Sequence, residues 1–257
     1  MSLLQMFNKI KNSNEIPNFF RNVFITAIPK KKKSSLDLSC QRGIFLIPKL
    51  RGIFLKLIYN SLINTIEENL SLSNIGARKE KSPRDHLFVL HSVMDETLKG
   101  KESCIDLVFY DLAQAYDSLW VDHTLLDLYE NNVNSNLLNL LHELSKKTTI
   151  SIKTPVGISD KREIDETIMQ GEMVSSILCT TTVDKISKDC PLEHLKYRKK
   201  VEIPELGFVD DLCDVNKCGK ETREKNADTS EKSINEDSSS ANISVSGCIS
   251  RVKQNKV

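Results

Sequence analysis

The sequence has almost no net charge, since 36 Lys and Arg residues stand against 35 Asp and Glu residues in a chain of 257. This balance excludes a histone-like basic protein and a strongly acidic one, so any phosphate-binding surface must be a local feature. Hydrophobic residues make up 39% of the chain, and the 9 Gly raise that share only slightly. The total is a little below the norm for globular proteins, which indicates that part of the chain is not packed.

Long apolar runs are also missing. The most apolar stretch, Ile44–Tyr59, is interrupted by Lys49, Arg51 and Lys56, too often for a helix that crosses a bilayer. The apolar patch Leu3–Phe7 is too short for a secretory signal. We therefore expect an intracellular protein with no membrane-spanning helix and no membrane partner. Its seven cysteines are expected to be reduced thiols.

Several common motifs for metal binding and catalysis are absent. The His and Cys residues show no zinc-ligand spacing, and Cys213 and Cys218 have no matching Cys or His pair. The sequence contains no phosphate-binding Gly-rich loop and no nucleophile elbow. The pattern therefore gives no support to a zinc site, a P-loop nucleotidase or an α/β-hydrolase.

The composition changes sharply near residue 219. From Gly219 to Val257 there is no Leu and no aromatic residue, while Ser, Lys, Glu, Asp and Asn dominate. Such a segment buries too little apolar area to offset the entropy lost on ordering. We predict a disordered polar tail over residues 219–257.

Hydrophobic spacing predicts several helices before the tail. Apolar residues three and four positions apart predict a helix over Phe54–Leu70. A second helix is expected to begin at Pro83, which suits the first helical position, with Asp85 at the capping-box position. Shorter apolar patterns predict helices after Asn136 and after Gly171.

Short segments rich in β-branched and aromatic residues lie between these helices. They are predicted to be strands: Phe24–Ile28, Cys104–Tyr110, Thr148–Ile152 and Leu206–Val209. The mixture predicts an α+β fold with helices on one face of a small sheet. The pentapeptide Arg42-Gly-Ile-Phe-Leu recurs at Arg51, but two copies are too few for a repeat architecture.

Two adjacent carboxylates, Asp210 and Asp211, follow the last predicted strand. Acids held together at the edge of a core repel each other, and a divalent cation is the usual partner of such a pair. A simpler interpretation is a hairpin turn that uses Asp, which turns favour. On this pair alone the hairpin interpretation is the stronger one.

A further carboxylate, Asp111, ends the apolar strand that begins at Cys104. At a strand end, its side chain would point at whatever binds the edge of the sheet. The segment after it carries Tyr116 and Asp117. A turn or capping residue is the alternative for Asp111, and for Asp117 we prefer that alternative.

Polar and basic residues elsewhere give weaker signals. The Gln170-Gly171 pair joins a side chain that both donates and accepts hydrogen bonds to a residue that lets a ligand approach the backbone. Basic clusters occur at Lys30–Lys33 and between Lys196 and Lys200. They are either solvated loops or contacts to phosphate groups.

In order along the chain, several of these pieces form a recognisable set. The set comprises the basic loop, Cys40-Gln41-Arg42-Gly43-Ile44, Gly76-Ala77-Arg78-Lys79, Phe109-Tyr110-Asp111 to Tyr116-Asp117, Gln170-Gly171 and Phe208-Val209-Asp210-Asp211. It resembles the reverse transcriptase domain of non-LTR (LINE-like) retrotransposons from about residue 16 to residue 215. The Asp-Asp box alone is weakly specific, but the ordered set is specific.

The resemblance implies a right-hand polymerase fold. Residues 1–103 would form a fingers-like region and residues 104–218 the palm, with no recognisable thumb after Val215. It also implies that Asp111, Asp210 and Asp211 are the catalytic, metal-binding acids. They would hold two Mg²⁺ ions, with Mn²⁺ as an alternative.

The same resemblance implies a nucleotide site. Tyr116 matches the aromatic residue that senses the sugar of the incoming nucleotide, and Gln170 with Gly171 matches the motif beside nucleotide and template. Arg42, and less surely Lys30, match residues that grip the triphosphate. The implied partners are an RNA template, a DNA primer and deoxynucleoside triphosphates.

The chemistry of nucleotidyl transfer agrees with this residue set. Attack of a primer 3′-hydroxyl on an α-phosphate needs an activated nucleophile and a stabilised pyrophosphate, and two Mg²⁺ ions supply both. Mg²⁺ prefers carboxylate oxygens and keeps several waters. Asp111 and Asp210 lie far apart in the sequence, so only the fold can bring them together.

Some residues depart from the family's pattern. Met169 stands where Arg is common, and Glu172-Met173-Val174 replaces a segment that usually contains Pro. Ala77 stands where an aromatic residue is common. Together with the lack of a recognisable thumb after Val215, these departures favour a fragment with intact carboxylates and a weak grip on a duplex.

Three functions stay open at this point. The first is an RNA-directed DNA polymerase of retroelement origin, and the second a truncated or co-opted fragment that binds nucleic acid, or a protein partner, without polymerising. The third is a soluble α+β domain whose acids are surface turns. A nuclear location would fit the first, although the Lys30–Lys33 run is a weak import signal.

Overall fold

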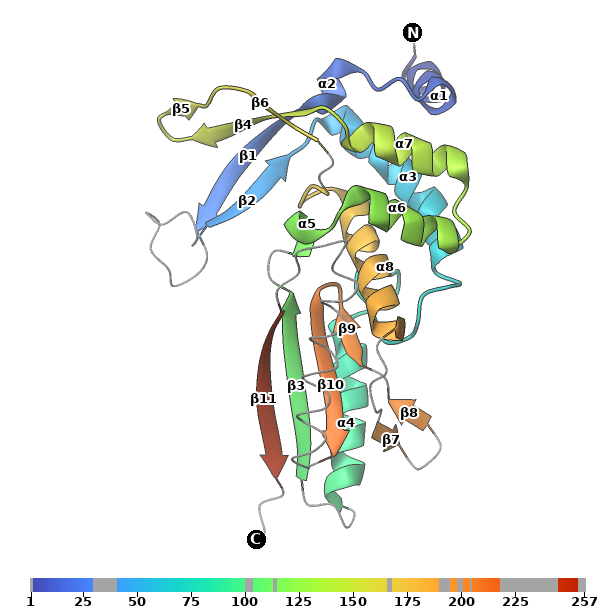
Figure 1. Cartoon of the computed structure of the whole chain (residues 1–257), viewed down its shortest axis with the longest axis vertical. Coiled ribbons are helices and arrows are strands. Elements are labelled where there is room, and N and C mark those ends of the chain that lie inside the picture. The colour runs from blue at the N-terminus through green and yellow to red at the C-terminus, as the bar shows by residue number, and fades with distance from the viewer. Residues whose placement is uncertain are drawn as a thin grey trace. The chain divides into compact units, whose positions relative to one another are not determined.

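The computed structural model describes residues 2–29, 41–99, 104–112, 115–165, 168–189, 195–197, 201–203, 205–217 and 245–253 (Figure 1). The chain folds into two compact units, each built from two separate stretches. The first unit comprises Met1–Glu68 with Leu119–Ser176, and the second comprises Asn69–Ser118 with Ile177–Val257. These limits differ from the linear division at residues 103 and 104. Mixed helices and sheets confirm the predicted α+β class.

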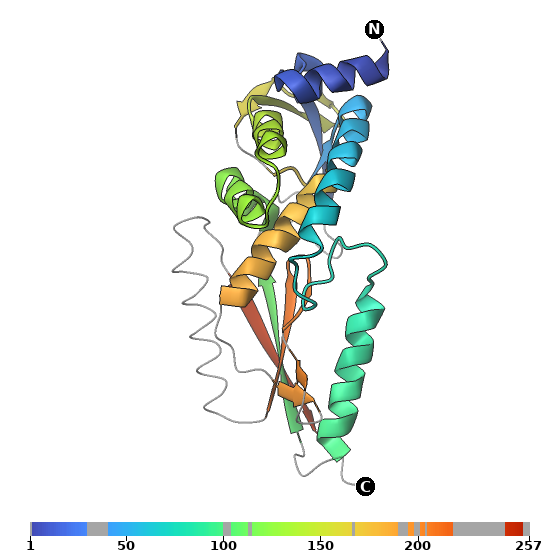
Figure 2. The same ribbon diagram turned by 90° about the vertical axis from the view of Figure 1, so that its right-hand side faces the viewer.

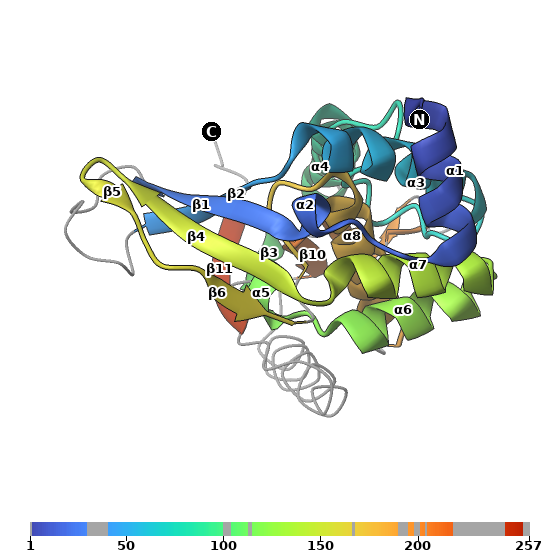
Figure 3. The ribbon, with the colours of Figure 1, turned by 90° about the horizontal axis from the view of Figure 1, so that it is seen from above.

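The first unit contains a mixed sheet of five strands. The strands are β1 (Asn22–Pro29), β2 (Gln41–Leu46), β4 (Thr148–Thr154), β5 (Gly157–Ile158) and β6 (Arg162–Ile164). Their order is β2-β1-β4-β5, with β6 also paired to β4. Figure 3 shows β1 between β2 and β4, and β1 runs parallel to β4 while the other pairs are antiparallel.

Helices complete the first unit. They are α1 (Leu3–Ser13), α2 (Asn18–Arg21), α3 (Lys49–Ile66), α6 (Val121–Glu130) and α7 (Ser135–Ser145). The core contains the rings of Phe7, Phe20 and Phe54, with the Phe54 ring centroid 5.1 Å from that of Phe7 and 6.0 Å from that of Phe20. Contacts between aromatic rings add to the area they bury, so these three rings join the first two helices to α3.

The second unit is built on an antiparallel sheet with the strand order β11-β3-β10-β9 (Figure 1). Its elements are α4 (Pro83–Lys99), β3 (Cys104–Leu112), α5 (Ala115–Ser118), β7 (Leu195–Tyr197), β8 (Val201–Ile203), β9 (Leu206–Phe208), β10 (Asp211–Lys217) and β11 (Val245–Lys253). Strands β7 and β8 form a separate pair. Helix α8 (Met173–Asp189) begins in the first unit and ends in the second.

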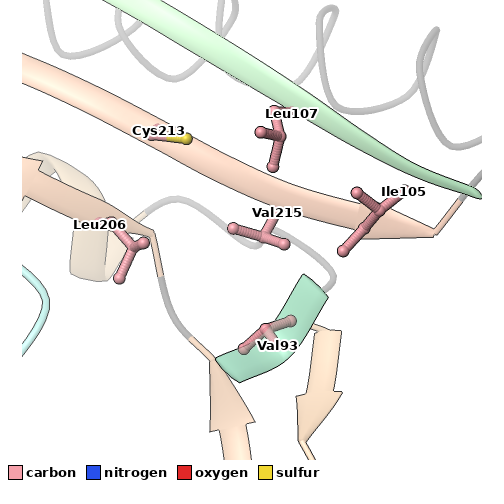
Figure 4. Packing of buried hydrophobic residues seen from close by; sticks show 6 residues of the cluster. All are labelled: Val93, Ile105, Leu107, Leu206, Cys213 and Val215. Carbon is pink, nitrogen blue, oxygen red and sulfur yellow. The ribbon is translucent and has the colours of Figure 1, made fainter. Parts of the chain in front are cut away.

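Helix α4 lies along one face of this sheet (Figure 2). Alternate residues of a strand point to one face, and here those residues are apolar. The buried cluster between helix and sheet is shown in Figure 4 and consists of Val93, Ile105, Leu107, Leu206, Cys213 and Val215. At the start of α4, the Ser82 N–H donates to the Asp85 carboxylate at 2.7 Å, as the capping-box position predicts.

The expected disordered tail contains a strand. Val245–Lys253 pairs with the whole of β3, from Val245 opposite Leu112 to Lys253 opposite Cys104. The polar average composition of residues 219–257 did not indicate this strand. The strand has three β-branched residues and pairs with the backbone edge of β3. The rest of the predicted tail, apart from 245–253, lies outside the described residues.

The other predicted elements are largely confirmed. The four predicted strands are β1, β3, β4 and β9, and the four predicted helices are α3, α4, α7 and α8. Helix α3 begins earlier than expected, at Lys49, directly after Pro48. None of the helices within the described ranges combines the length and apolar composition needed to cross a bilayer.

Two carboxylates lie buried on neighbouring strand segments of the second unit. Glu205 is 6% exposed and Asp214 is 4% exposed. Burial, together with the nearby Asp214 charge, raises the pKa of Glu205 to about 7, although the Ser187 hydroxyl donates to it. Burial raises the pKa of Asp214 to about 6, against a hydrogen bond from Tyr110 that lowers it.

These raised pKa values predict a loss of stability as the pH rises. Between about pH 4 and pH 7 the folded chain holds protons that the unfolded chain releases, so the free energy of unfolding falls across that window. In Glu205→Gln, the free energy of unfolding should fall less between about pH 4 and pH 7, and the fall should be smaller by roughly 2–3 kcal/mol. Urea unfolding at several pH values measures it, and an unchanged slope in the variant would contradict the prediction.

Candidate active site

The Asp-Asp pair lies on a hairpin in the second unit. Strands β9 and β10 pair antiparallel, with Phe208 opposite Asp211, so Val209 and Asp210 form the turn. The structure therefore contains the hairpin of the simpler interpretation. Asp211 is the first residue of β10, and its direction is fixed by the strand rather than by the turn.

Asp111 lies directly opposite Asp211. Strands β3 and β10 are antiparallel neighbours, and their register pairs Asp111 with Asp211 at the end of β3 where the hairpin turns. Opposite residues of an antiparallel pair share a face of the sheet, so the two carboxylates are neighbours. Burial, and then the Asp111 charge, raises the pKa of Asp211. The fold thus brings together acids that the sequence separates, although the residue opposite Asp111 is Asp211 and not Asp210.

Asp210 is close to a second pair of side chains. Tyr116, on α5, is half-buried, and burial raises its pKa to about 12 with contributions from Cys179 and Asp210. Cys179, on α8, is fully buried, and burial together with the Asp210 charge raises its pKa to about 12. At neutral pH the phenol and the thiol therefore keep their protons. Asp117 lies beside Tyr116 in α5.

The sequence singled out Tyr116, whose role at a nucleotide stays a prediction, but it did not single out Cys179, which lies near the same Asp210. The thiol lies in a helix whose start was predicted at Met173, and no metal or nucleophile pattern surrounds it. The sequence also did not single out Asn74, whose buried side chain forms two hydrogen bonds with the backbone of Val209. The only available signal was Gly76, which the resemblance singled out without giving it a role.

The expected nucleotide-binding residues belong to the first unit, except Tyr116. Arg42 is exposed on β2, opposite Ile28. The Phe45 N–H donates to the Gln170 carbonyl at 3.3 Å, so the Gln-Gly turn lies against the strand that carries Arg42. Gly171 has φ +115, and an added Cβ would lie 3.1 Å from the Phe45 carbonyl oxygen. Lys30 lies outside the described residues.

A buried ion pair holds the residue after this turn. Arg51 Nε donates to Glu172 Oε1 at 2.6 Å, and the two side chains are 1% and 9% exposed. Arg51 also donates to the Phe20 carbonyl at 3.2 Å. Burial raises the pKa of Glu172, while Arg51 lowers it. Glu172, one of the departures from the family pattern, is therefore tied to helix α3.

The acids fit a hard divalent cation in part. Among the described residues, no three His, Cys, Asp or Glu side chains are grouped closely enough to hold an ion by themselves. Mg²⁺ rarely needs such a group, because it is usually bound by one or two carboxylates, with waters and substrate phosphates completing its shell. The repulsion between Asp111 and Asp211 is the kind that a cation between them relieves.

The facing carboxylates predict a stability effect. Without divalent ions, Asp211→Asn should raise the melting temperature, because it removes a negative charge that lies opposite Asp111. The repulsion that is relieved should stabilise the fold by less than about 1 kcal/mol. Thermal unfolding in a chelator measures this change. Asp160→Asn is the matched control, since Asp160 is exposed in the first unit. A lower melting temperature for Asp211→Asn alone would contradict the proximity of the two acids.

The Arg51–Glu172 pair predicts strong coupling. Arg51→Met leaves a buried carboxylate without its partner and should cost roughly 3–5 kcal/mol of unfolding free energy. The double variant Arg51→Met with Glu172→Met should lose much less, because no charge is left buried. Urea unfolding of the parent, both single variants and the double variant measures the coupling. Additive losses would show that the pair is not coupled.

Comparisons with known proteins bear on the sequence and the fold separately. No protein-family model matches the chain. The RNA-directed DNA polymerase from mobile element jockey of Drosophila melanogaster is 25% identical over 120 residues, which is 46% of this chain. The match covers 13% of the jockey protein, so the chain spans a small part of that relative's length.

Solved structures match over almost the whole chain. Telomerase from Candida albicans, in complex with a fragment of telomeric RNA, has a TM-score of 0.63 at 14% identity over 98% of this chain and 46% of its own. Truncated apo telomerase from Candida tropicalis gives 0.60 at 14% identity over 95% of this chain and 54% of its own. The RNA polymerase complex inside a double-stranded RNA virus gives 0.56 at 14% identity over 95% of this chain and 21% of its own. The chain thus has the α+β fold of reverse transcriptases and related polymerases, and it resembles the reverse transcriptase domain of non-LTR retrotransposons.

Proposed function

We propose that this chain carries the catalytic acids of an RNA-directed DNA polymerase of retroelement origin. The observation that carries the proposal is the register between β3 and β10, which sets Asp111 opposite Asp211 with Asp210 next in the chain. The order of motifs and the similarity to the jockey polymerase support the same activity. The proposed reaction is nucleotidyl transfer to a primer 3′-hydroxyl.

The three acids would hold Mg²⁺, and Mn²⁺ is an alternative with the same preference for oxygen ligands. When bound, two such ions would favour the deprotonated 3′-hydroxyl and neutralise the charge that develops on pyrophosphate. Asp111 and Asp211 supply carboxylate oxygens from two paired strands, a rigid support for a binding site. Asp210 supplies a carboxylate from the turn.

The other site residues would bind the nucleotide through their own chemistry. Tyr116 keeps its phenolic proton at neutral pH and offers a half-buried ring to the sugar of the incoming nucleotide. Arg42 carries a permanent charge for the triphosphate, and Lys30 would add a second. Gln170 offers a donor and an acceptor to nucleotide or template.

The proposed partners are an RNA template, a DNA primer and deoxynucleoside triphosphates. Two of the similar telomerase structures contain a fragment of telomeric RNA, which supports an RNA partner for this chain. Net charge does not create a basic surface here, since the formal charge is +1. Contacts to phosphate would therefore depend on local cations such as Arg42.

A second function is favoured by a specific observation in the first unit. Met169 stands where the family commonly has Arg, and its side chain is 1% exposed. Glu172 is buried in an ion pair with Arg51. A co-opted fragment that binds nucleic acid without polymerising would have lost cations and polar contacts in this manner.

Primer extension on an RNA template tests the first function. Asn in place of Asp111, Asp210 or Asp211 should each lower incorporation by at least about a hundredfold, because each change removes one oxygen anion from the site. Asp160→Asn is the control with the same chemical change on an exposed residue. Equal incorporation by the parent and the three site variants would refute catalysis by these acids.

Filter binding to the same RNA separates the two functions. Binding by phosphate contacts weakens as salt rises, and it should survive Asp111→Asn under both functions. Extension that depends on the three acids supports the polymerase, whereas RNA binding with no extension supports the co-opted fragment.

A further inference from the structure

The loop between α3 and α4 runs beside strand β9 in the second unit. The Gly207 N–H donates to the Ser73 carbonyl at 2.8 Å, and the Ile75 N–H donates to the Gly207 carbonyl at 3.0 Å. These two bonds flank Asn74 and form a short parallel bridge between Asn74 and Gly207. The loop is therefore fixed to the strand that leads into the Asp210 turn.

The Asn74 side chain binds both backbone groups of Val209. Its Oδ1 accepts from the Val209 N–H at 3.1 Å, and its Nδ2 donates to the Val209 carbonyl at 3.0 Å. Oδ1 also accepts from the Gly76 N–H at 3.0 Å. Asn74 is 1% exposed, so its side chain is almost completely removed from water. A carboxamide is needed for this set, because it offers an acceptor and a donor side by side.

Val209 needs such support because its backbone is strained. Its φ is 62°, in the left-handed region that β-branched residues strongly disfavour. Residues in this conformation persist only where surrounding contacts hold them. Val209 is the residue immediately before Asp210 in the turn, so its conformation sets the direction of Asp210.

Two glycines make room for the contact. A Cβ on Gly76 would overlap the backbone nitrogen of Val209, and a Cβ on Gly207 would lie 3.0 Å from the Asn74 side chain. The loop itself is held in place, since Thr180 Oγ1 donates to the Gly76 carbonyl at 3.1 Å and Arg78 donates to the Asn74 carbonyl at 3.1 Å. A glycine in each segment, Gly76 in the loop and Gly207 in β9, therefore allows the loop to approach the strand closely.

We propose that Asn74 is a positioning residue for the candidate active site. Its carboxamide holds Val209 in the left-handed conformation and thereby fixes the turn residue Asp210 relative to Asp111 and Asp211, which the strands already hold opposite each other. The assignment of these acids as cation ligands rests on the proposed function, whereas the restraint on Val209 does not. No hydrophobic side chain and no carboxylate can replace Asn74, because neither donates to the Val209 carbonyl.

The restraint is tested first by amide hydrogen exchange, which needs no metal and no substrate. In Asn74→Ala, exchange at the Val209 amide should quicken by at least tenfold, because its acceptor is removed. Asn136→Ala should leave that rate unchanged, since Asn136 is exposed on α7. If Asn74→Ala does not fold, Asn74→Asp is used, and release of the Val209 carbonyl should make the turn amides exchange faster. Parent-like exchange throughout the turn in the folded variant would overturn the proposal.

Binding of Mn²⁺ alone, followed by electron paramagnetic resonance, tests the consequence for the acids. Asn74→Ala should weaken Mn²⁺ binding by at least fivefold in the parent background. In a Val209→Gly background the same change should have little effect, because glycine adopts a positive φ without steric cost. Equal losses in both backgrounds would overturn the positioning role, since they would indicate packing damage alone.

The two arms separate this proposal from the proposed function. If the parent binds no Mn²⁺, the cation-binding role of the acids fails while the exchange result still decides whether Asn74 restrains Val209. If Mn²⁺ binds through Asp211 and Asn74→Ala changes neither exchange nor affinity, the proposed function stands and the positioning role falls.

Discussion

The antiparallel register between β3 and β10 is the constraint on which the candidate site depends. It places Asp111 and Asp211 on the same face at the same level of the sheet. The apolar cluster under α4 includes Ile105 and Leu107 of β3 and Val215 of β10, whose side chains alternate with those on the other face. A slip of one residue would move this entire set out of the core, so the core that stabilises the sheet also fixes the distance between the acids.

The site therefore carries two kinds of unfavourable interaction. Facing carboxylates repel, and a valine with a positive φ is strained. Both are tolerated because the rest of the second unit determines the backbone around them, the first through strand pairing and the second through Asn74. Strain and repulsion of this kind concentrate at functional sites, where a ligand or cation relieves them.

The major elements could be predicted from the sequence, because the period of hydrophobic residues is a local signal. The ordered motifs singled out Asp111, Asp210 and Asp211, whose catalytic role stays a prediction. The pentapeptide that begins at Arg42 and recurs at Arg51 shows why other features of the fold could not be predicted from local sequence. One copy is strand β2 and the other lies in helix α3, so the same local sequence follows different tertiary partners. Likewise, the pairing of Val245–Lys253 with β3 and the contact of Asn74 with Val209 depend on neighbours distant in sequence.

A carbon-13 pH titration of the Asp211 carboxylate is the most direct test of this arrangement. Burial, and then the neighbouring Asp111 charge, should raise the pKa of Asp211 above the ordinary range of an aspartate. In Asp111→Asn the pKa of Asp211 should fall, because the repelling charge is gone. An Asp211 pKa that does not change in this variant would contradict a shared site for the two acids.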